Sequence, residues 1–441
     1  MIGAHKMYRE TTEQLLKFIE KSPSPFHVIE NMEVELNKAG FIKLKENKRW
    51  NLKKGGSYYV TRNDSSIIAF KIPEKDFRNF NIMASHSDSP SFKIKENPEI
   101  KVDNKYVKLN VEKYGGMIMS PWFDRPLSAA GRILVKEDDG IKSVNVNIDR
   151  DLFVIPNLAI HMNREANDGY KYNAQKDMLP LLAGENMDVK FADIVAEAAN
   201  VKKEDIIATD MFLYNRQRSS IWGACNEYMS CTKLDDLQCA YSSLRAIINS
   251  NNKESVAVHC VFDNEEVGSG TKQGAASTFL KDVLSRINSN LGKDDEDLNV
   301  ALSSSFMVSA DNAHAVHPNY SDKSDPTNRP YINGGIVIKH SANQKYTTDA
   351  VSCAIMKMIC EKAEVPVQMF HNRSDMLGGS TLGNISNSQV ALNTVDIGVA
   401  QLAMHSPYET GGIKDTMYLI KTAEQFYNSN IIINGKDITI S

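Results

Sequence analysis

The sequence lacks an excess of charge of either sign. Its 441 residues include 51 Lys and Arg and 55 Asp and Glu, which gives a formal net charge of −4 at pH 7. Proteins that bind nucleic acid through its phosphates carry a basic field, and the composition provides none. We therefore expect no nucleic-acid partner.

Long hydrophobic runs are also missing. No stretch approaches the roughly 20 apolar residues that cross a bilayer. The N-terminal segment MIGAHKMYRETTEQ carries charges and has no apolar core of the kind found in signal peptides. We expect a cytoplasmic protein with no membrane partner.

The sequence has few cysteines, and the six present form no C-x-x-C pair. Small buried thiols in a reduced interior are the simplest interpretation. No G-x-S-x-G elbow occurs, and no cysteine lies in a recognisable nucleophile motif. Serine- and cysteine-protease chemistry therefore has no support.

What is present is an ordinary globular composition, with 42% hydrophobic and 24% charged residues. This excludes a disordered, collagen-like or coiled-coil protein. Since domains typically span about 100–200 residues, the length predicts two domains, one of them large.

The two ends of the chain show strand–helix alternation, whereas the middle shows an antiparallel pattern. Alternating segments such as 101–111 and 141–148 are typical of antiparallel β structure. The simplest organisation is an α/β domain formed by residues 1–91 and 231–441, with a β-rich domain of residues 92–230 inserted between them.

Five segments bring potential metal ligands to the end of an apolar run or to the start of a helix. In open α/β sheets, ligands bind outside the carboxyl ends of the strands, so we expect these segments to converge in one crevice. The residues concerned are His86, Asp88, Asp235, Glu265, Glu266, Asp311 and His405.

Taken singly, these residues have other interpretations. An isolated H-x-D is often an exposed loop pair, although strand geometry also lets Asp88 accept the second ring N–H of a metal-bound His86. Asp235 lies three residues after Thr232 and fits a capping box at a helix start. His405 precedes a Ser-Pro break and is typical of a loop histidine.

The adjacent carboxylates Glu265 and Glu266 are harder to explain without a cation. They follow a buried strand and repel each other unless positive charge compensates them. Oxygen and imidazole ligands without cysteine suit Zn²⁺, Mn²⁺ or Co²⁺ in a hydrolytic site. A bridging carboxylate between two ions is an aminopeptidase arrangement, and a spare glutamate could act as base. Spacing alone does not say which glutamate has which role.

With these motifs, the chain resembles the M18 family of metallo-aminopeptidases, which includes the aspartyl aminopeptidases and aminopeptidase I. The resemblance covers nearly the whole length. It is carried in order by Ser22-Pro-Ser-Pro-Phe-His27, Ser85-His-Ser-Asp-Ser-Pro90, Tyr114-Gly-Gly, Trp122-Phe-Asp-Arg125, Leu158-Ala-Ile-His161, Leu234-Asp-Asp-Leu237, Asp263-Asn-Glu-Glu-Val-Gly-Ser269, Ser309-Ala-Asp-Asn-Ala-His314, Gly379-Ser-Thr381 and Gln401-Leu-Ala-Met-His-Ser406.

The resemblance implies two divalent metal ions per subunit, Zn²⁺ first, with Co²⁺ and Mn²⁺ as alternatives. One ion would be held by His86 and Asp311 and the other by Glu266 and His405, and Asp235 would bridge both.

The family also implies roles for residues that do not bind metal. Glu265 would be the general base, and Asp88 would orient the metal-bound histidine. Lys339 and Tyr346 would lie near the pocket for the substrate side chain.

For the fold, the resemblance implies a mixed sheet with helices on both faces and an inserted β-rich dimerisation domain. Members of the family assemble from dimers into tetrahedral dodecamers, so the implied partners are copies of the same chain and short peptide substrates. His161 would reach the active site of a neighbouring subunit and help to stabilise the tetrahedral intermediate.

One segment departs from the family members that act on acidic residues. Arg373 and Asp375 are retained, but Met376 and Leu377 are more apolar than the family pattern. A cationic pocket favours Asp or Glu at the substrate N-terminus, whereas apolar walls favour Leu or Met. The sequence leaves both preferences open.

The leading hypothesis is therefore an aminopeptidase that acts on short peptides. Two alternatives are a related di-metal amidohydrolase, such as a deacylase, and a catalytically silent self-assembling scaffold. The inserted domain with the His161 segment favours the M18 enzyme over the first, and the complete set of candidate ligands with the candidate base favours it over the second.

Overall fold

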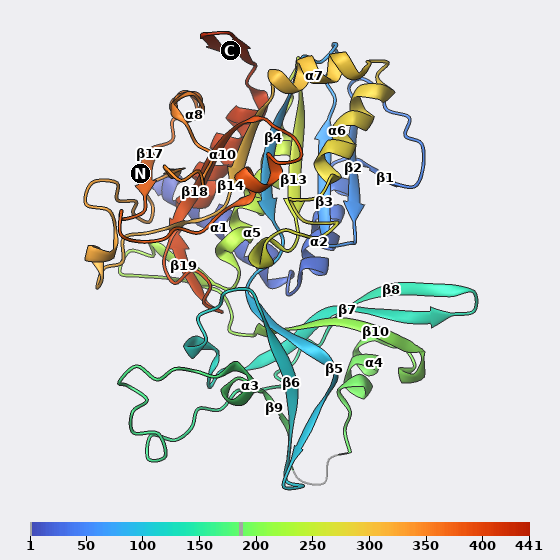
Figure 1. Ribbon diagram of the computed structural model, residues 1–441, viewed down its shortest axis with the longest axis vertical. Coiled ribbons are helices and arrows are strands. Elements are labelled where there is room, and N and C mark those ends of the chain that lie inside the picture. The colour runs from blue at the N-terminus through green and yellow to red at the C-terminus, as the bar shows by residue number, and fades with distance from the viewer. Residues whose placement is uncertain (1, 185–187) are drawn as a thin grey trace.

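The computed structural model describes residues 2–184 and 188–441. Its main feature is a ten-stranded mixed sheet, above a six-stranded antiparallel sheet in the view of Figure 1. The large sheet runs in the order β1 (Ile42–Leu44), β2 (Ser57–Arg62), β3 (Ser66–Lys71), β13 (Ser255–Phe262), β4 (Asn79–His86), β14 (Phe306–Ala310), β18 (Asn393–Gln401), β16 (Ile336–His340) and β17 (Val367–His371), and β15 (Ala313–His314) pairs with β18.

The middle of the large sheet is parallel. Strands β13, β4, β14 and β18 are joined by parallel pairing, whereas β3 and β16 flank them antiparallel. All eight residues of β4 and of β13 are buried. The carboxyl ends of the four parallel strands therefore meet at one edge of a buried sheet.

Helices cover both faces of this sheet. Because side chains alternate along a strand, Met83 packs into the hydrophobic core on one face, and Ile82 and Ala84 pack into the core on the other. The first core includes α1 (Ile2–Glu20), α2 (Pro25–Lys38), α5 (Leu234–Asn249), α8 (Ala350–Lys362) and α10 (Asp415–Asn428). The second includes α6 (Phe279–Asn290), α7 (Asp295–Ser303) and the first residue of α9 (Leu382–Ser386).

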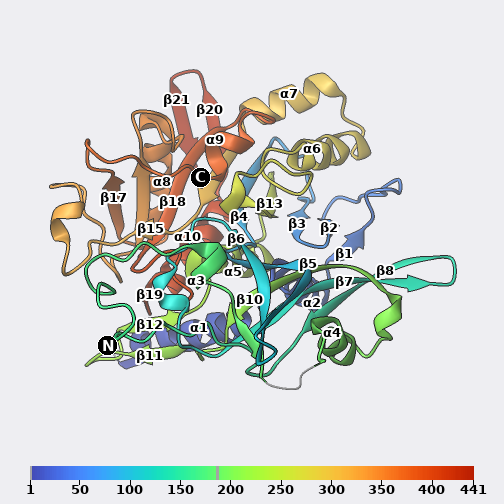
Figure 2. The ribbon, with the colours of Figure 1, turned by 60° about the horizontal axis from the view of Figure 1, so that its bottom comes forward.

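The six-stranded sheet has its own hydrophobic core, to which α4 (Phe191–Ala199) contributes. Figure 2 shows β5 and β6 running toward α5 and the large sheet. The strand order is β8 (Gly140–Asn147), β7 (Leu127–Glu137), β10 (Ile206–Asn215), β5 (Ser91–Val102), β6 (Tyr106–Tyr114) and β9 (Leu181–Ala183), with the short helix α3 (Ala174–Asp177) before β9.

Two small sheets complete the fold. Strands β11 (Ser220–Trp222), β12 (Tyr228–Cys231) and β19 (Glu409–Gly412) form one, and the hairpin β20 (Ile431–Asn434) and β21 (Asp437–Ile440) forms the other. Within the described residues, no helix combines the length and the apolar character that a membrane crossing needs.

The predicted fold class is confirmed, with helices on both faces of a mixed sheet and an inserted β-rich region. Helix α6 begins at Phe279, and α10 is followed by the β20–β21 hairpin. The domain boundaries at residues 91 and 230 stay a prediction.

The core contains a histidine that the fold keeps neutral. His259 of β13 is fully buried, with Nδ1 2.8 Å from Ser243 Oγ and no hydrogen-bond partner for Nε2. Burial lowers the pKa of His259 to about 3. The unfolded chain binds a proton at this residue near pH 6.5, whereas the folded chain does not, so stability is lost as the pH falls below about 6.5.

We expect the variant His259→Gln to lack this acid sensitivity. The stability of the wild type relative to the variant should fall by up to about 1.4 kcal/mol for each pH unit between 6.5 and 4.5. Thermal unfolding of both proteins in chelator at several pH values measures this difference. A difference independent of pH would show that His259 is protonated in the folded state.

Candidate active site

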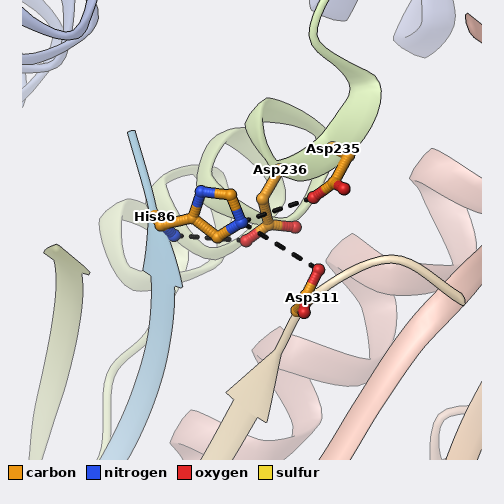
Figure 3. Close-up of side chains that lie close together, drawn as sticks. All are labelled: His86, Asp235, Asp236 and Asp311. Carbon is orange, nitrogen blue, oxygen red and sulfur yellow. Dashed lines mark hydrogen bonds and ion pairs between the residues drawn. The ribbon is translucent and has the colours of Figure 1, made fainter. Parts of the chain in front are cut away.

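His86 lies at the centre of a cluster of carboxylates. It ends β4, and its Nε2 is 3.3 Å from Asp235 Oδ1 and 4.0 Å from both Asp311 Oδ1 and Glu265 Oε2. The backbone N–H of His86 donates to Asp236 Oδ2 at 3.2 Å. Figure 3 shows the imidazole facing side chains from the start of α5 and from the segment after β14. The carboxyl ends of the neighbouring strands β4 and β14 and the start of helix α5 therefore meet at this cluster.

Asp235 faces two imidazoles at once. It is buried in the first turn of α5, with Oδ1 3.3 Å from His86 Nε2 and Oδ2 3.4 Å from His405 Nε2. The Asp235–Asp236 peptide bond is cis. The N-cap residue of α5 is Lys233, and no side chain caps the helix. The alternative interpretation of Asp235 as part of a capping box is therefore wrong.

The two glutamates are held by the buried carboxylate of Asp88. They lie in a 3-10 turn, Glu265–Val267, directly after β13. Their backbone N–H groups donate to Asp88 at 3.1 and 3.2 Å, and Asp88 Oδ1 is 3.3 Å from His86 Nδ1. The side chain of Glu266 reaches the other histidine, with Oε2 3.4 Å from His405 Nε2. Asp88 thus fixes both the glutamate turn and one imidazole.

His405 follows β18 and has a left-handed backbone, with φ at 67°. Its N–H donates to Glu409 Oε1 at 2.8 Å, and its Nδ1 lies 2.8 Å from the carbonyl oxygen of Gly116. Because a carbonyl oxygen only accepts, Nδ1 carries the proton. Nε2 is then the nitrogen that faces Asp235 and Glu266, and it can carry a second proton toward them or bind a cation.

The site concentrates negative charge. Burial, with the charges of Asp311 and Asp88, raises the pKa of Glu265 to about 8, although His86 opposes the shift. Burial also raises the pKa of Asp311 to about 6 and that of Glu266 well above its usual value. For His405, the contacts with Asp235 and Glu266 outweigh burial and raise the pKa to about 10. A nearby cation would reverse this balance.

The donor set fits divalent metal. Three buried carboxylate oxygens, Asp235 Oδ1, Asp236 Oδ1 and Glu266 Oε1, have no hydrogen-bond partner. Buried polar atoms are normally paired, so unpaired oxygens beside imidazole nitrogens fit a site that binds a cation. The groups able to hold an ion are His86 with Asp235, Asp236 and Asp311, His86 with Glu265 and Glu266, and Asp235 with Glu266 and His405.

Four residues near the site were missed by the sequence analysis. Asp236 belongs to the first of these groups, and its position beside Asp235 was the available signal. Glu409 accepts the backbone N–H groups of Asp235 and His405, at 3.1 and 2.8 Å. Tyr114 donates to Asp88 at 2.7 Å, and Gly116 accepts from His405. Tyr114 and Gly116 belong to the Tyr114-Gly-Gly motif of the family resemblance, which gave them no role, and a lone glutamate such as Glu409 carries no signal that would assign it to a site.

Lys339 and Tyr346 lie beside one of the candidate metal ligands. The buried Lys339 ammonium is 3.5 Å from Asp311 Oδ2, donates to the Asp311 carbonyl at 2.7 Å, and lies 5.1 Å from the centre of the Tyr346 ring. Tyr346 packs with Phe370 in a small apolar cluster. The Lys339 ammonium therefore lies next to an apolar cluster that includes Tyr346 and Phe370.

Within a single chain, His161 does not join this cluster of candidate ligands. It lies in an exposed turn of the inserted region, and in the described residues no hydrogen bond or ion pair joins it to the candidate ligands. Its neighbours Leu158, Ile160 and Met162 are also exposed, Met162 by 70%. Exposed apolar side chains in one segment are typical of a surface that another molecule covers.

Comparison with known sequences agrees with the geometry. A family model described as "Aminopeptidase I zinc metalloprotease (M18)" matches residues 18–427. A relative from Clostridium acetobutylicum named "Probable M18 family aminopeptidase 2" is 47% identical, covering 95% of this chain and 99% of its own. A relative of the same name from Ectopseudomonas mendocina is 40% identical, covering 96% and 99%.

Solved structures share the fold. The chain is similar to one in "Cryo-EM structure of the Ape4 and Nbr1 complex", with a TM-score of 0.92, 35% identity, and 96% of this chain and 86% of that chain covered. It is also similar to the S. cerevisiae mApe1 dodecamer, with a TM-score of 0.84, 26% identity, and 95% and 97% covered.

The raised pKa values predict that zinc binding displaces protons. At pH 7 the metal-free site holds protons on groups such as Glu265 and His405, whose pKa values are raised to about 8 and about 10. Zinc ligands such as His405 must be deprotonated, and the charge of the ions lowers the pKa of the neighbouring Glu265, so zinc binding releases these protons. We expect fewer protons per ion at pH 9 than at pH 7, because Glu265 is then already ionised.

Titration calorimetry of metal-free protein with Zn²⁺, in two buffers that differ in protonation enthalpy, counts the protons. The variant His405→Ala should release fewer protons than the wild type at pH 7. Equal release at pH 7 and pH 9 would contradict the raised pKa of Glu265.

Proposed function

The chain belongs to the M18 family of zinc metallo-aminopeptidases, and we propose that its carboxylate–imidazole cluster binds two Zn²⁺ ions and removes the N-terminal residue from short peptides. An exopeptidase of this family needs a site that holds the metal, a base for the attacking water and access for a free peptide N-terminus.

The observation that carries the proposal is the position of Asp235. Its two oxygens are directed to different histidines, Oδ1 to His86 at 3.3 Å and Oδ2 to His405 at 3.4 Å. A carboxylate divided in this way suits a bridge between two ions, each with one imidazole ligand.

The proposed ligand sets follow from the same contacts. His86 and Asp311 would hold one ion, Glu266 and His405 the other, and Asp235 would bridge both. When bound, the ions supply Lewis-acid polarisation of the scissile carbonyl and a lowered pKa for the attacking water. Asp88 and Gly116 keep the two imidazoles oriented through their Nδ1 atoms.

Glu265 is the proposed general base. Its Oε2 is 4.0 Å from His86 Nε2, and the side chain is only 12% exposed. Burial favours the neutral carboxyl of Glu265 and raises its pKa to about 8 in the metal-free site, so the group is suited to accept a proton. It would take a proton from the attacking water at its carboxylate and pass the proton to the leaving amine.

The substrate side chain would bind beside Lys339 and Tyr346. The Lys339 ammonium favours an acidic side chain, although Asp311 already lies 3.5 Å from it. Tyr346, Phe370 and Val337 provide an apolar wall that favours Leu or Met. The proposed substrates are therefore peptides that begin with an acidic or a neutral apolar residue.

The proposed working form is a dodecamer built from dimers, in which the inserted region mediates dimerisation. One similar solved structure is described as a dodecamer, and the apolar segment around His161 is exposed in the single chain. In the assembly His161 would reach the active site of a neighbouring subunit and stabilise the tetrahedral intermediate. The proposed location is the cytoplasm.

Hydrolysis of aminoacyl-amide substrates with Asp, Glu, Leu, Met or Lys tests the function. We expect chelator-sensitive release that returns with Zn²⁺, led by Asp and Glu or by Leu and Met. The matched variant Glu265→Gln should bind zinc and assemble normally but lose activity by about 10²–10⁴-fold, because the amide cannot accept the proton. Unchanged activity in this variant would remove Glu265 as the base.

No release of any residue, with any metal, would reject the aminopeptidase. Release of an acyl group from N-acylated substrates instead would make the protein a deacylase that uses the same ligands.

His161→Ala tests the role across subunits. We expect normal folding, zinc content and assembly but a kcat lowered by about 10²–10³-fold, as for loss of one oxyanion donor. Zinc content, size-exclusion chromatography and steady-state kinetics measure these quantities. Loss of one zinc ion per subunit in the variant would instead make His161 a ligand.

A further inference from the structure

The end of strand β6 reaches the metal-binding cluster. Tyr114, its last residue, donates its hydroxyl proton to Asp88 Oδ2 at 2.7 Å and accepts from Asn264 Nδ2 at 2.8 Å. The Tyr114 ring packs edge-on against Phe212 of β10, with the ring centres 5.4 Å apart. The six-stranded sheet therefore presents a fixed donor to a carboxylate of the other sheet's active site.

Asp88 transmits this contact to the candidate ligands. Its carboxylate is fully buried and accepts from three donors, the hydroxyl of Tyr114 and the backbone N–H groups of Glu265 and Glu266. His86 Nδ1 lies 3.1 Å from the backbone carbonyl oxygen of Asp88 and 3.3 Å from its carboxylate oxygen Oδ1, so Asp88 contacts the imidazole twice. Without the Tyr114 hydroxyl, Asp88 Oδ2 keeps only a 3.2 Å backbone contact, so the carboxylate, and through it Asp88 as the partner of His86, is less firmly fixed.

The residues after Tyr114 reach the other half of the cluster. The Gly116 carbonyl oxygen lies 2.8 Å from His405 Nδ1 and fixes which nitrogen of that ring carries the proton. Gly115 has φ +78, and a Cβ atom on it would lie 3.1 Å from Glu266 Cβ and 3.3 Å from the Glu266 carbonyl oxygen. Only glycine therefore permits this approach without displacing a candidate ligand.

We propose that the turn Tyr114–Gly116 sets the metal affinity of the site, with Tyr114 as a positioning residue that acts through Asp88 on His86 and with the Gly116 carbonyl acting on His405. The inference rests on the proposed function, because it takes this cluster to be the zinc site. Under this proposal, the inserted six-stranded sheet contributes to metal binding in addition to its proposed role in dimerisation.

The variant Tyr114→Phe tests the proposal, because it removes the hydroxyl and keeps the ring. Competition with a chromophoric chelator measures the zinc Kd of the metal-free protein. We expect the Kd to rise by about 10–100-fold, the usual effect of losing a residue that orients a metal ligand. Activity should be low at limiting zinc and return toward the wild-type kcat at saturating zinc, with KM little changed.

Tyr214→Phe is the matched control. Tyr214 also lies in the six-stranded sheet and also donates a hydrogen bond, to Asn147 Oδ1 at 2.8 Å. No hydrogen bond or ion pair joins its described side chain to a candidate ligand. We expect its zinc Kd to equal that of the wild type.

A second pair of variants tests the glycine approach without changing Tyr114. Gly115→Ala should weaken zinc binding, because its Cβ would meet Glu266. Gly40→Ala carries the same backbone penalty, with φ +83, but a Cβ there meets nothing within 4 Å. It should lower thermal stability and leave the zinc Kd unchanged.

A wild-type Kd in Tyr114→Phe would overturn the proposal. If Tyr114→Phe does not fold, the glycine pair decides, and equal zinc affinity of Gly115→Ala and Gly40→Ala would overturn it. Absence of zinc binding by the wild type itself would reject the zinc site of the proposed function. Wild-type binding of zinc with an unaffected Tyr114→Phe rejects only this inference.

Discussion

Repulsion among buried carboxylates is the constraint on which the rest of the site depends. Asp235, Asp311 and the two adjacent glutamates lie around two imidazoles. Burial raises the pKa of Asp311 and of both glutamates, whereas the contacts with His405 and His86 outweigh burial and lower the pKa of Asp235. Two of their oxygens, Asp235 Oδ1 and Glu266 Oε1, have no hydrogen-bond partner among the described residues. Such an arrangement is stable as a set of anions only with cations among them, and this need links the geometry to the zinc chemistry of the M18 family.

The fold supplies the rigidity that keeps these charges together. His86 ends strand β4 and the glutamates follow strand β13; these two strands pair in parallel and are buried along their whole length. Side chains at such strand ends have little freedom to move apart, because the strands are fixed by packing on both faces. The energy of the hydrophobic cores thus holds in place a polar cluster that would be unfavourable by itself.

The inserted six-stranded sheet contacts the candidate active site through only a few atoms of the described residues. Tyr114 contacts Asp88 and the Gly116 carbonyl contacts His405, so one strand end reaches both halves of the cluster. The region that the sequence suggested for assembly is therefore also connected to the candidate metal ligands. His161, in the same region, is exposed, and no hydrogen bond or ion pair among the described residues joins it to a candidate ligand of its own chain.

The sequence by itself determined the α/β class, the inserted β region and the candidate ligands, because hydrophobic periodicity and residues at strand ends are local properties. It left the capping of α5, the contact of Glu409 with two ligand backbones and the contact of Tyr114 with Asp88 undecided. Those contacts join residues far apart in the chain, and no local pattern encodes them. Only the tertiary structure decided them, since pairing of β4 with β13 and closure of β6 onto the cluster set which distant polar atoms meet.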